Sequence, residues 1–354
     1  MSNSTENLNF SEPVTALIGV LIALCIILTL LGNFIVLLAF TKVKSLRNFS
    51  DYLILNLAIS DFLIGAIGIS FYAPYVLTGI WPMGHGMCLF WLVVDYITPA
   101  ASAINIFIIS LDRYIQVAHP LWARNNQTTM LLAVFLLTPW IIPTLYFVPA
   151  ICLWEVTKGR VIPDGECFLP YNDNVIVLSI GACIEFVFPF VTVATFNLLV
   201  YVSIRRRSKK FWPNIRKPGQ GSLRPTPSST ETGPSRIVLD DQEMIVTTGK
   251  SDNNHQKVAL QRDRKAARSL FILVFVFALC WMPYEVLATT STICGGDCIN
   301  PVLYEFTFWI LWLNSTINPI LYPLLHSRYR IAFYKLLGVK KNTVAPTTMS
   351  HHNT

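Results

Sequence analysis

The sequence predicts an all-α membrane protein: a bundle of seven transmembrane helices followed by a short amphipathic eighth helix. Of its 354 residues, 53% are hydrophobic and 13% are charged, and the mean hydropathy is +0.51. A soluble domain carries roughly 25% charged residues. Each of seven apolar segments is long enough to cross a hydrocarbon core of about 30 Å, which takes about 20 helical residues. They are residues 14–40, 62–80, 86–111, 126–154, 174–204, 269–292 and 306–325.

The positions of lysine and arginine predict the topology of these spans. Basic residues follow the first, fifth and seventh spans and precede the sixth, whereas the connection 81–85 contains none. The positive-inside rule then predicts an extracellular segment 1–13, a bundle over 14–325 and a cytosolic tail 338–354. The net charge of +7 belongs to the cytosolic membrane face by this reading, and no nucleic-acid partner is expected.

Two segments outside the bundle have distinct compositions. Residues at about 211–255 are rich in Pro, Ser, Thr and Gly, so we expect a disordered cytosolic loop there. Residues 326–337 place apolar side chains at helical spacing between basic ones, which is typical of a helix lying on membrane lipid. Asn3 and Asn9 occupy glycosylation triplets in the predicted extracellular segment.

Four cysteines lie in the predicted extracellular compartment, which is oxidising. We predict one disulfide between Cys88 and Cys167 and a second between Cys294 and Cys298. A zinc site at the second pair would lack further ligands nearby. The one metal ion that we expect is therefore sodium, at a separate site around Asp61.

Asp61 lies within the second span, where a lone acid requires polar partners. Polar residues at comparable depth on other spans are Ser102, Asn314, Ser315 and Asn318. Together they would form an oxygen-rich site for a small cation such as sodium. A water-filled hydrogen-bond network is the alternative interpretation.

The third span carries an acid, Asp95, in its outer half and an acid and base pair, Asp112 and Arg113, at its inner end. Eighteen residues separate Asp95 from Arg113. This is five helical turns, or roughly 27 Å, so both groups lie on one face near opposite leaflets. Because ionisable residues are costly in a membrane, such residues mark functional sites by default.

An ordered set of motifs marks every span. These are Gly32-Asn33, Asn56 to Asp61, Cys88 with Asp112-Arg113-Tyr114, Trp140, Pro189, Cys280-Trp281-Met282-Pro283, and Asn318-Pro319-Ile320-Leu321-Tyr322. The set resembles the class A (rhodopsin-like) G-protein-coupled receptors over all seven spans. The resemblance implies a multi-pass receptor of the plasma membrane, with a heterotrimeric G protein, arrestin and receptor kinases as partners.

Further residues resemble the aminergic group within that family. Asp95 follows Cys88 by seven residues, Glu185 precedes Pro189 by four, and Tyr284 follows Pro283. With the stretch 308–312, these residues resemble histamine receptors of the third and fourth subtypes. The resemblance implies that histamine or a similar amine is the ligand and that the inhibitory Gi/o class of G protein is the partner.

The inferred ligand site combines three acids with aromatic side chains. We expect it to contain Asp95, Tyr96, Glu185, Trp281, Tyr284, Glu285, Phe308 and Trp312. Aromatic rings supply cation-π contacts, and three carboxylates favour a ligand with more than one positive charge. A chemosensory receptor for a diamine or polyamine is therefore the alternative. Two simpler interpretations also stay open: the rings are packing residues, and Glu285 faces a wet vestibule.

Two departures from the resembling receptors lie near this site. Glu285 stands where they have a small hydroxyl residue, and Pro99 is expected to break the third helix one turn below Asp95. Both features affect the expected ligand more than the expected fold.

The inner end is expected to contain a switch. We predict that Arg113 pairs with Asp112 and Asp263, and that the sixth helix swings about Pro283 on activation. The other members of the switch are Tyr114, Asn318, Pro319 and Tyr322. Surface ion pairs and static proline kinks are the simpler alternatives.

Three other classes of protein fit poorly. A retinal-binding light sensor requires a lysine in the seventh span, and residues 306–325 contain none. A transporter would show two related halves, and no internal repeat is found. An enzyme is not expected, because the six histidines lie outside the spans and form no cluster with a nucleophile or a metal.

Overall fold

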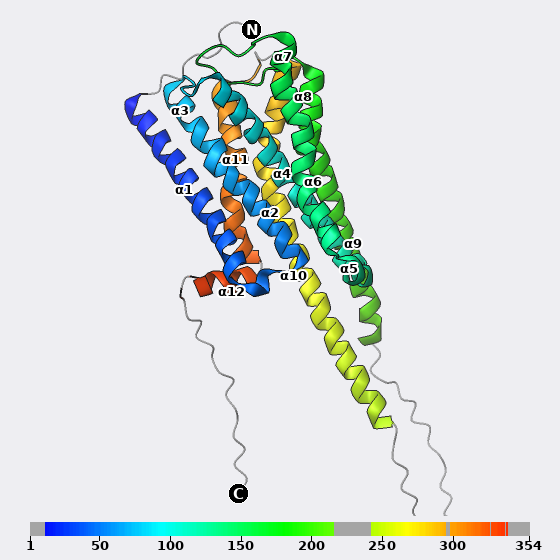
Figure 1. Cartoon of the computed structure of the whole chain (residues 1–354). Helices are drawn as coiled ribbons and strands as arrows, with labels where there is room; N and C mark the ends of the chain where they lie inside the picture. The colour runs from blue at the N-terminus through cyan, green and yellow to red at the C-terminus, as the bar shows by residue number, and fades with distance from the viewer. Residues whose placement is uncertain (1–10, 216–241, 295–297, 326, 337, 339–354) are drawn as a thin grey trace, which may run out of the picture.

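The computed structural model describes residues 11–215, 242–294, 298–325, 327–336 and 338. Long helices run side by side in one bundle, and a short helix, α12, lies across one end of it (Figure 1). The described ranges contain no strand. In chain order the elements are α1 (Glu12–Lys42), η1 (Lys44–Leu46), α2 (Phe49–Leu63), η2 (Ile64–Ile69), α3 (Ser70–Thr78), α4 (Gly84–Ala118), α5 (Pro120–Asn126), α6 (Thr129–Val148), η3 (Pro149–Leu153), α7 (Trp154–Lys158), α8 (Val175–Ala182), η4 (Cys183–Val187), α9 (Phe188–Ile215), α10 (Gln242–Ile293), α11 (Pro301–Leu325) and α12 (Ser327–Leu336).

Six helices among the described residues are long and apolar enough to cross a membrane. They are Glu12–Lys42, Phe49–Thr78, Gly84–Ala118, Thr129–Lys158, Val175–Ser208 and Ala267–Ile293. The helix α11 completes the bundle, although it is less apolar. Its polar residues Asn314, Ser315, Thr316 and Asn318 are buried against other helices. A span that directs its polar side chains inward needs less overall hydropathy, so the prediction of seven spans agrees with this arrangement.

Three wide π-type turns, η2, η3 and η4, interrupt the long helices. In η2 the Ser70 hydroxyl donates to the carbonyl oxygen of Gly65 (2.7 Å), which satisfies an acceptor released by the wide turn. Each wide turn changes the rotational register of the residues that follow it. Pro99, in contrast, does not break its helix: α4 is continuous from Gly84 to Ala118, and the expected interruption there was wrong.

The helix α4 lies at the centre of the bundle and packs against α2, α6 and α9. Of its most apolar 18-residue window, 72% is buried, compared with 11% for α1. Asn56 of α2 fixes one of these contacts by donating to Asn105 of α4 (2.9 Å) and accepting from the indole of Trp140 in α6 (2.9 Å). The central position gives α4 access to both ends of the bundle.

Pro319 of α11 is accommodated by two residues of α1. Because proline lacks an N–H, the carbonyl oxygen of Ser315, four residues earlier, loses its helical donor. Asn33 supplies a replacement through its amide nitrogen (3.1 Å). A Cβ on Gly32 would lie only 2.8 Å from Cγ of Pro319, so glycine is required for the close approach. The Gly32-Asn33 motif therefore has a packing explanation.

We name the two ends of the bundle by their contents. The "disulfide end" holds the Cys88–Cys167 disulfide and the Cys294–Cys298 disulfide. The "α12 end" holds α12 and η1. At the disulfide end, an ion pair between His85 Nε2 and Glu155 Oε2 (2.7 Å) also ties α4 to α7.

Several predicted features fall outside the described residues. Asn3 and Asn9 are among them, as are residues 216–241 within the expected loop 211–255. The helices α9 and α10 occupy the two flanks of that loop, up to Ile215 and from Gln242.

Candidate functional site

Three helical segments each bring one acid to the disulfide half of the bundle. Asp95 lies on α4, Glu185 in the wide turn η4, and Glu285 on α10; their exposed fractions are 5%, 9% and 6%. The charges of Glu285 and Asp95 both act on Glu185, so the three carboxylates share one region. Neither glutamate receives a hydrogen bond within the described part of the chain. The interpretation of Glu285 as a residue of a wet vestibule does not agree with this burial.

The Asp95 carboxylate is buried with an unused acceptor. Its Oδ1 atom has no hydrogen-bond partner among the described residues, and neither does the indole Nε1 of Trp312. The two atoms lie near one another beside Gly68, and the Trp312 indole stabilises the carboxylate at short range without reaching the geometry of a normal hydrogen bond. A buried carboxylate with an unfilled acceptor costs free energy that a bound ammonium group would recover.

Aromatic rings surround the acids on the α10 and α11 sides. The ring centroids of Tyr284 and Phe308 are 5.3 Å apart, and those of Phe308 and Trp312 are 4.3 Å apart. Trp281 lies deeper and stacks on Phe186 of η4 (6.5 Å, 6° between planes). These rings form a continuous wall from α10 to α11, of the kind that binds organic cations.

Tyr96 joins the same region from α4. Its ring packs against Phe147 of α6 at 5.3 Å, and its hydroxyl lies within electrostatic range of Glu185 and Asp95. All eight residues expected in the ligand site are therefore on elements that converge at the disulfide half of the bundle. Tyr96, Tyr284 and Trp312 lie within electrostatic range of at least one acid, and Phe308 packs between Tyr284 and Trp312.

Prolines remove a backbone hydrogen-bond donor near two of the three acids. Pro99 and Pro189 each stand four residues after an acid, Asp95 and Glu185 respectively. The missing N–H of each proline leaves the backbone carbonyl of that acid without its helical donor. Both acids consequently lie where the helical hydrogen-bond ladder is open, although α4 itself stays helical.

The sequence did not single out Tyr72 and Trp91, two residues that build the wall of this site. Tyr72 of α3 stacks on Trp91 of α4 (5.2 Å, 7°) and meets Trp312 edge-on (5.5 Å). Its hydroxyl donates to Glu305 of α11 (3.2 Å), and the indole of Trp309 donates to the same carboxylate (2.9 Å). The wide turn η2 precedes Tyr72 and changes its rotational register, so helical periodicity in the sequence could not place it.

The Asp61 network forms in the middle of the bundle. Its Oδ1 accepts from the hydroxyls of Ser102 (3.1 Å) and Ser315 (2.9 Å), and its Oδ2 accepts from the amide of Asn318 (2.8 Å). Asp61 is fully buried, and the amide oxygen of Asn314 is also buried, with no hydrogen-bond partner among the described residues. One carboxylate, two hydroxyls and a spare amide oxygen are suitable ligands for a hard cation.

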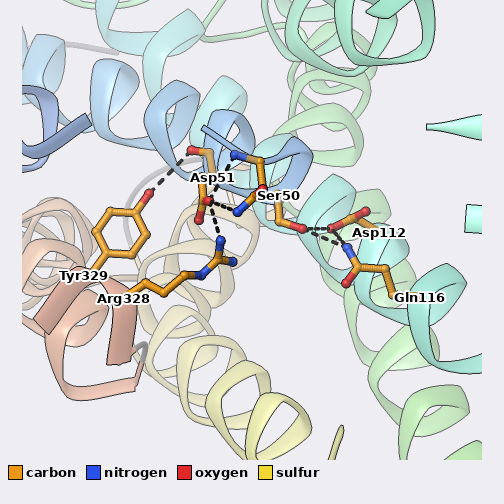
Figure 2. A network of polar contacts seen from close by, with 7 residues as sticks. Ser50, Asp51, Asp112, Gln116, Arg328 and Tyr329 are labelled. Atoms are coloured by element: carbon orange, nitrogen blue, oxygen red, sulfur yellow. Dashed lines mark hydrogen bonds and ion pairs between the residues drawn. The ribbon is translucent and has the colours of Figure 1, made fainter. Parts of the chain in front are cut away.

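A second polar network occupies the α12 end (Figure 2). Asp112 of α4 accepts hydrogen bonds from the hydroxyl of Ser50 in α2 (2.6 Å) and from Gln116 (2.8 Å). It accepts a third from Gln127 beside α5 (2.9 Å). Gln116 also donates to the Ser50 oxygen (2.8 Å). One turn of α4 is thus joined to α2 and to the α5 segment.

The residue next to Ser50 extends this network to α12. Asp51 forms a capping box with Asn48 at the start of α2, and its Oδ2 pairs with Arg328 of α12 at 2.9 Å. The hydroxyl of Tyr329 donates to the Asp51 carbonyl oxygen at 3.5 Å. Burial and the Asp51 carboxylate raise the pKa of Tyr329, so its hydroxyl remains a donor.

The predicted ion pair between Asp112 and Arg113 is not among the described contacts, and this part of the switch prediction was wrong. Neighbouring residues on a helix point about 100° apart, so they do not face one another. Asp112 uses Ser50, Gln116 and Gln127 instead. The Asp263 side chain lies outside the described residues, and so does its predicted contact with Arg113.

Of the remaining switch residues, Tyr114 and Tyr322 lie toward the α12 end, whereas Pro283 lies between Trp281 and Tyr284 in the disulfide half. Tyr114 packs on Phe196 of α9 (5.5 Å), and Tyr322 packs on Tyr329 (5.9 Å) with its own buried hydroxyl unpaired among the described groups. Pro283 lies inside α10, two residues after Trp281, and α10 continues through it. The described residues contain no cluster of three His, Cys, Asp or Glu that could hold a metal ion.

Comparison with known proteins gives the same family as these features. The model of the family "7 transmembrane receptor (rhodopsin family)" matches residues 32–322. The chain is 34% identical to the human histamine H4 receptor, covering 96% of each chain, and 32% identical to the rat histamine H4 receptor, covering 99% of this chain and 98% of that one. It is 24% identical to the human muscarinic acetylcholine receptor M1, covering 91% and 89%. The chain therefore belongs to the rhodopsin family of seven-transmembrane receptors, which are multi-pass membrane proteins and not enzymes.

Proposed function

We propose that this protein is an amine-activated receptor that binds histamine or a similar small basic amine between its helices. The observation that carries the proposal is the buried Asp95 carboxylate, whose Oδ1 has no partner among the described groups and lies beside an aromatic wall. The relatives named as histamine H4 receptors support the same ligand class. The ammonium group would pair with Asp95, and the ring of the ligand would pack between Tyr284, Phe308 and Trp312.

A diamine or polyamine is the second candidate ligand, and the buried pair Glu185 and Glu285 favours it. A ligand with one positive charge neutralises only one of the three acids. The second ammonium of a diamine would pair with these glutamates and relieve their mutual repulsion. This alternative describes a chemosensory amine receptor on the same scaffold.

The test is a panel of amines applied to the expressed receptor, with guanine-nucleotide exchange on a purified heterotrimeric G protein as the readout. The panel contains histamine, monoamines, 1,4-diaminobutane and spermidine. Strongest activation by histamine supports the first candidate, and strongest activation by the diamine or spermidine supports the second. Absence of exchange with every amine contradicts both candidates.

We propose the inhibitory Gi/o class as the G-protein partner, because the resemblance to histamine receptors of the third and fourth subtypes implies it. The same assay tests this when Gi, Gs and Gq heterotrimers are supplied separately. Faster exchange on Gs or Gq than on Gi contradicts the assignment. Arrestin and receptor kinases are proposed as further partners that engage the active receptor.

The disulfide end is proposed to face the extracellular side of the plasma membrane. Disulfides need an oxidising compartment. The Lys and Arg residues gather in the connections on the opposite side of the predicted membrane, as the positive-inside rule expects of a cytosolic face. Glycosylation offers a direct check: Asn3→Gln and Asn9→Gln should each reduce the apparent mass of the expressed protein. Glycan on neither residue, together with protease protection of the amino terminus, contradicts this orientation.

The Asp61 network is proposed to hold a sodium ion. A sodium ion would supply positive charge against the buried carboxylate, and Asp61, Ser102, Asn314 and Ser315 would offer oxygen atoms to it, with Asn318 orienting the carboxylate. Sodium, but not potassium, should then lower agonist affinity, and Asp61→Asn should remove that difference. Equal sodium sensitivity in the variant would favour the water-filled network.

A switch that opens the α12 end toward the G protein is proposed as well. Arg113 and Tyr114 on α4, Pro283 on α10, and Asn318, Pro319 and Tyr322 on α11 are its members. Contact between Arg113 and Asp263 would stabilise the closed state, so Asp263→Ala should raise basal nucleotide exchange. Unchanged basal exchange would argue that the two residues form at most a surface ion pair.

A further inference from the structure

We infer that Gly68 is a positioning residue for Asp95, which sets the place of the carboxylate that receives the amine. The inference rests on the proposed function, because it assigns a role in amine binding to a residue that itself offers no polar side chain. It begins from the wide turn η2, which contains Gly68 and lies against α4.

Gly68 lies very close to the Asp95 carboxylate. A Cβ at this position would lie 3.0 Å from Oδ1 of Asp95 and 3.9 Å from Nε1 of Trp312. Few side chains approach a Cβ as closely as 3.0 Å, so any larger residue would push the carboxylate away. The bare Cα of Gly68 is therefore what permits Asp95 to lie against the η2 backbone.

The backbone of Gly68 is held in place by a neighbouring indole. Trp91 of α4 donates from Nε1 to the carbonyl oxygen of Gly68 at 3.0 Å, and both residues are buried. Trp91 lies four residues before Asp95 on the same helix, one turn away. One turn of α4 thus fixes Gly68 through Trp91 and places Asp95 against it, so the turn η2 and the acid are located relative to one another.

The unpaired Oδ1 is the atom that this contact positions. It has no hydrogen bond of normal geometry from any described group, so its place is set by the close approach to Gly68 together with the neighbouring Trp312 indole. Shifting a charged group by a few tenths of an ångström weakens an ion pair whose geometry is set by the surrounding helices. Gly68 consequently acts on the amine through Asp95 alone.

The chain contains a matched control in the same turn. A Cβ at Gly65, also in η2, would lie 2.9 Å from Cγ2 of Thr29 on α1, on the side away from Asp95. Gly65→Ala therefore strains η2 at least as much as Gly68→Ala without crowding the acid. Gly86 is an open control, because nothing lies within 4 Å of its added Cβ.

The experiment measures histamine affinity by competition binding on the full-length receptor in membranes, with 1,4-diaminobutane as the second probe. Gly68→Ala should lower the affinity for each amine about tenfold, which corresponds to about 1.4 kcal/mol. Gly65→Ala and Gly86→Ala should change it less than about twofold. The melting temperature of the ligand-free receptor should fall more for Gly65→Ala than for Gly68→Ala. Alanine brings the same gain in helix propensity at both positions, but at Gly65 the added Cβ clashes with the packed Thr29 side chain of α1.

Two results would overturn the inference: unchanged affinity in Gly68→Ala, or an equal loss in Gly65→Ala. Both are distinct from failure of the proposed function, in which the parent receptor binds neither amine or Asp95→Asn binds as the parent does. A loss confined to Gly68→Ala, with the parent binding and Asp95→Asn not binding, supports the positioning role.

Discussion

The buried acids of the disulfide half and those of the rest of the bundle differ in how many hydrogen bonds they receive. Asp61 and Asp112 each accept three from side chains of other residues. Glu185 and Glu285 accept none among the described groups, and one oxygen of Asp95 is also unpaired. Both sets are almost inaccessible to water.

This difference separates acids that stabilise the fold from acids that need a ligand. A saturated carboxylate contributes to helix packing, so its removal leaves donors unpaired and lowers stability. A buried carboxylate that lacks hydrogen-bond donors costs stability. Its removal should therefore leave the fold intact but lower the affinity for a cationic ligand. Substitutions in the two sets of acids should therefore differ in whether they change ligand affinity or stability.

Asp95→Asn should cause the largest loss. Truncating one partner of a buried charge pair typically costs about 2–5 kcal/mol, or roughly thirtyfold and more in affinity. The response to every amine in the nucleotide-exchange assay should therefore disappear. The fold should survive, because no described group donates to Oδ1. Retained amine affinity, with normal surface expression, would contradict the assignment of Asp95.

Glu285→Gln and Glu185→Gln should weaken dications selectively. Each should reduce the affinity of 1,4-diaminobutane about tenfold, near 1.4 kcal/mol, while monoamines change little. Glu305→Gln is the matched control, because the Glu305 carboxylate already accepts from Tyr72 and Trp309. Diamine potency that survives Glu285→Gln would show that the third acid does not match ligand charge.

Asp51→Asn should reduce stability more than ligand affinity. The exposed fraction of the Arg328 side chain is 46%, so solvent screens this pair, and the change should cost about 1 kcal/mol, or a melting temperature about 2–4 °C lower. Arg328→Gln should cost a similar amount, and the double variant little more than either. Asp164→Asn is the control, since the Arg160–Asp164 pair is exposed on both sides. Full additivity of the two changes would show that Asp51 and Arg328 do not interact.

The sequence predicts the positions of the buried acids far better than it predicts their hydrogen-bond partners. Apolar length identifies the spans, and the cost of burying charge identifies Asp61, Asp95, Glu185 and Glu285 as unusual. These are local properties of the chain. Each acid could therefore be found before any partner was known.

Hydrogen-bond partners depend on helix rotation and on loop conformation, which the sequence does not display. Gln127 reaches Asp112 only because the α5 segment folds back beneath α4, and Gly68 meets Asp95 only because η2 is a wide turn. The adjacency of Asp112 and Arg113 in sequence was misleading for the same reason, since helical neighbours diverge. Partners of buried acids are thus the part of the site that requires a structure.

Ser50→Ala should give the smallest effect and the most direct test of the saturated set. It removes one of three donors to Asp112, the shortest at 2.6 Å, and leaves Gln116 and Gln127 in place. The loss should be about 0.5 kcal/mol of stability, with basal nucleotide exchange raised by less than about fivefold and amine affinity unchanged. Ser179→Ala is the control, because the Ser179 hydroxyl donates only to the carbonyl of Val175 in its own helix. A change in amine affinity as large as that of Asp95→Asn would mean that the two ends of α4 are coupled too tightly for the two sets of acids to have separate roles.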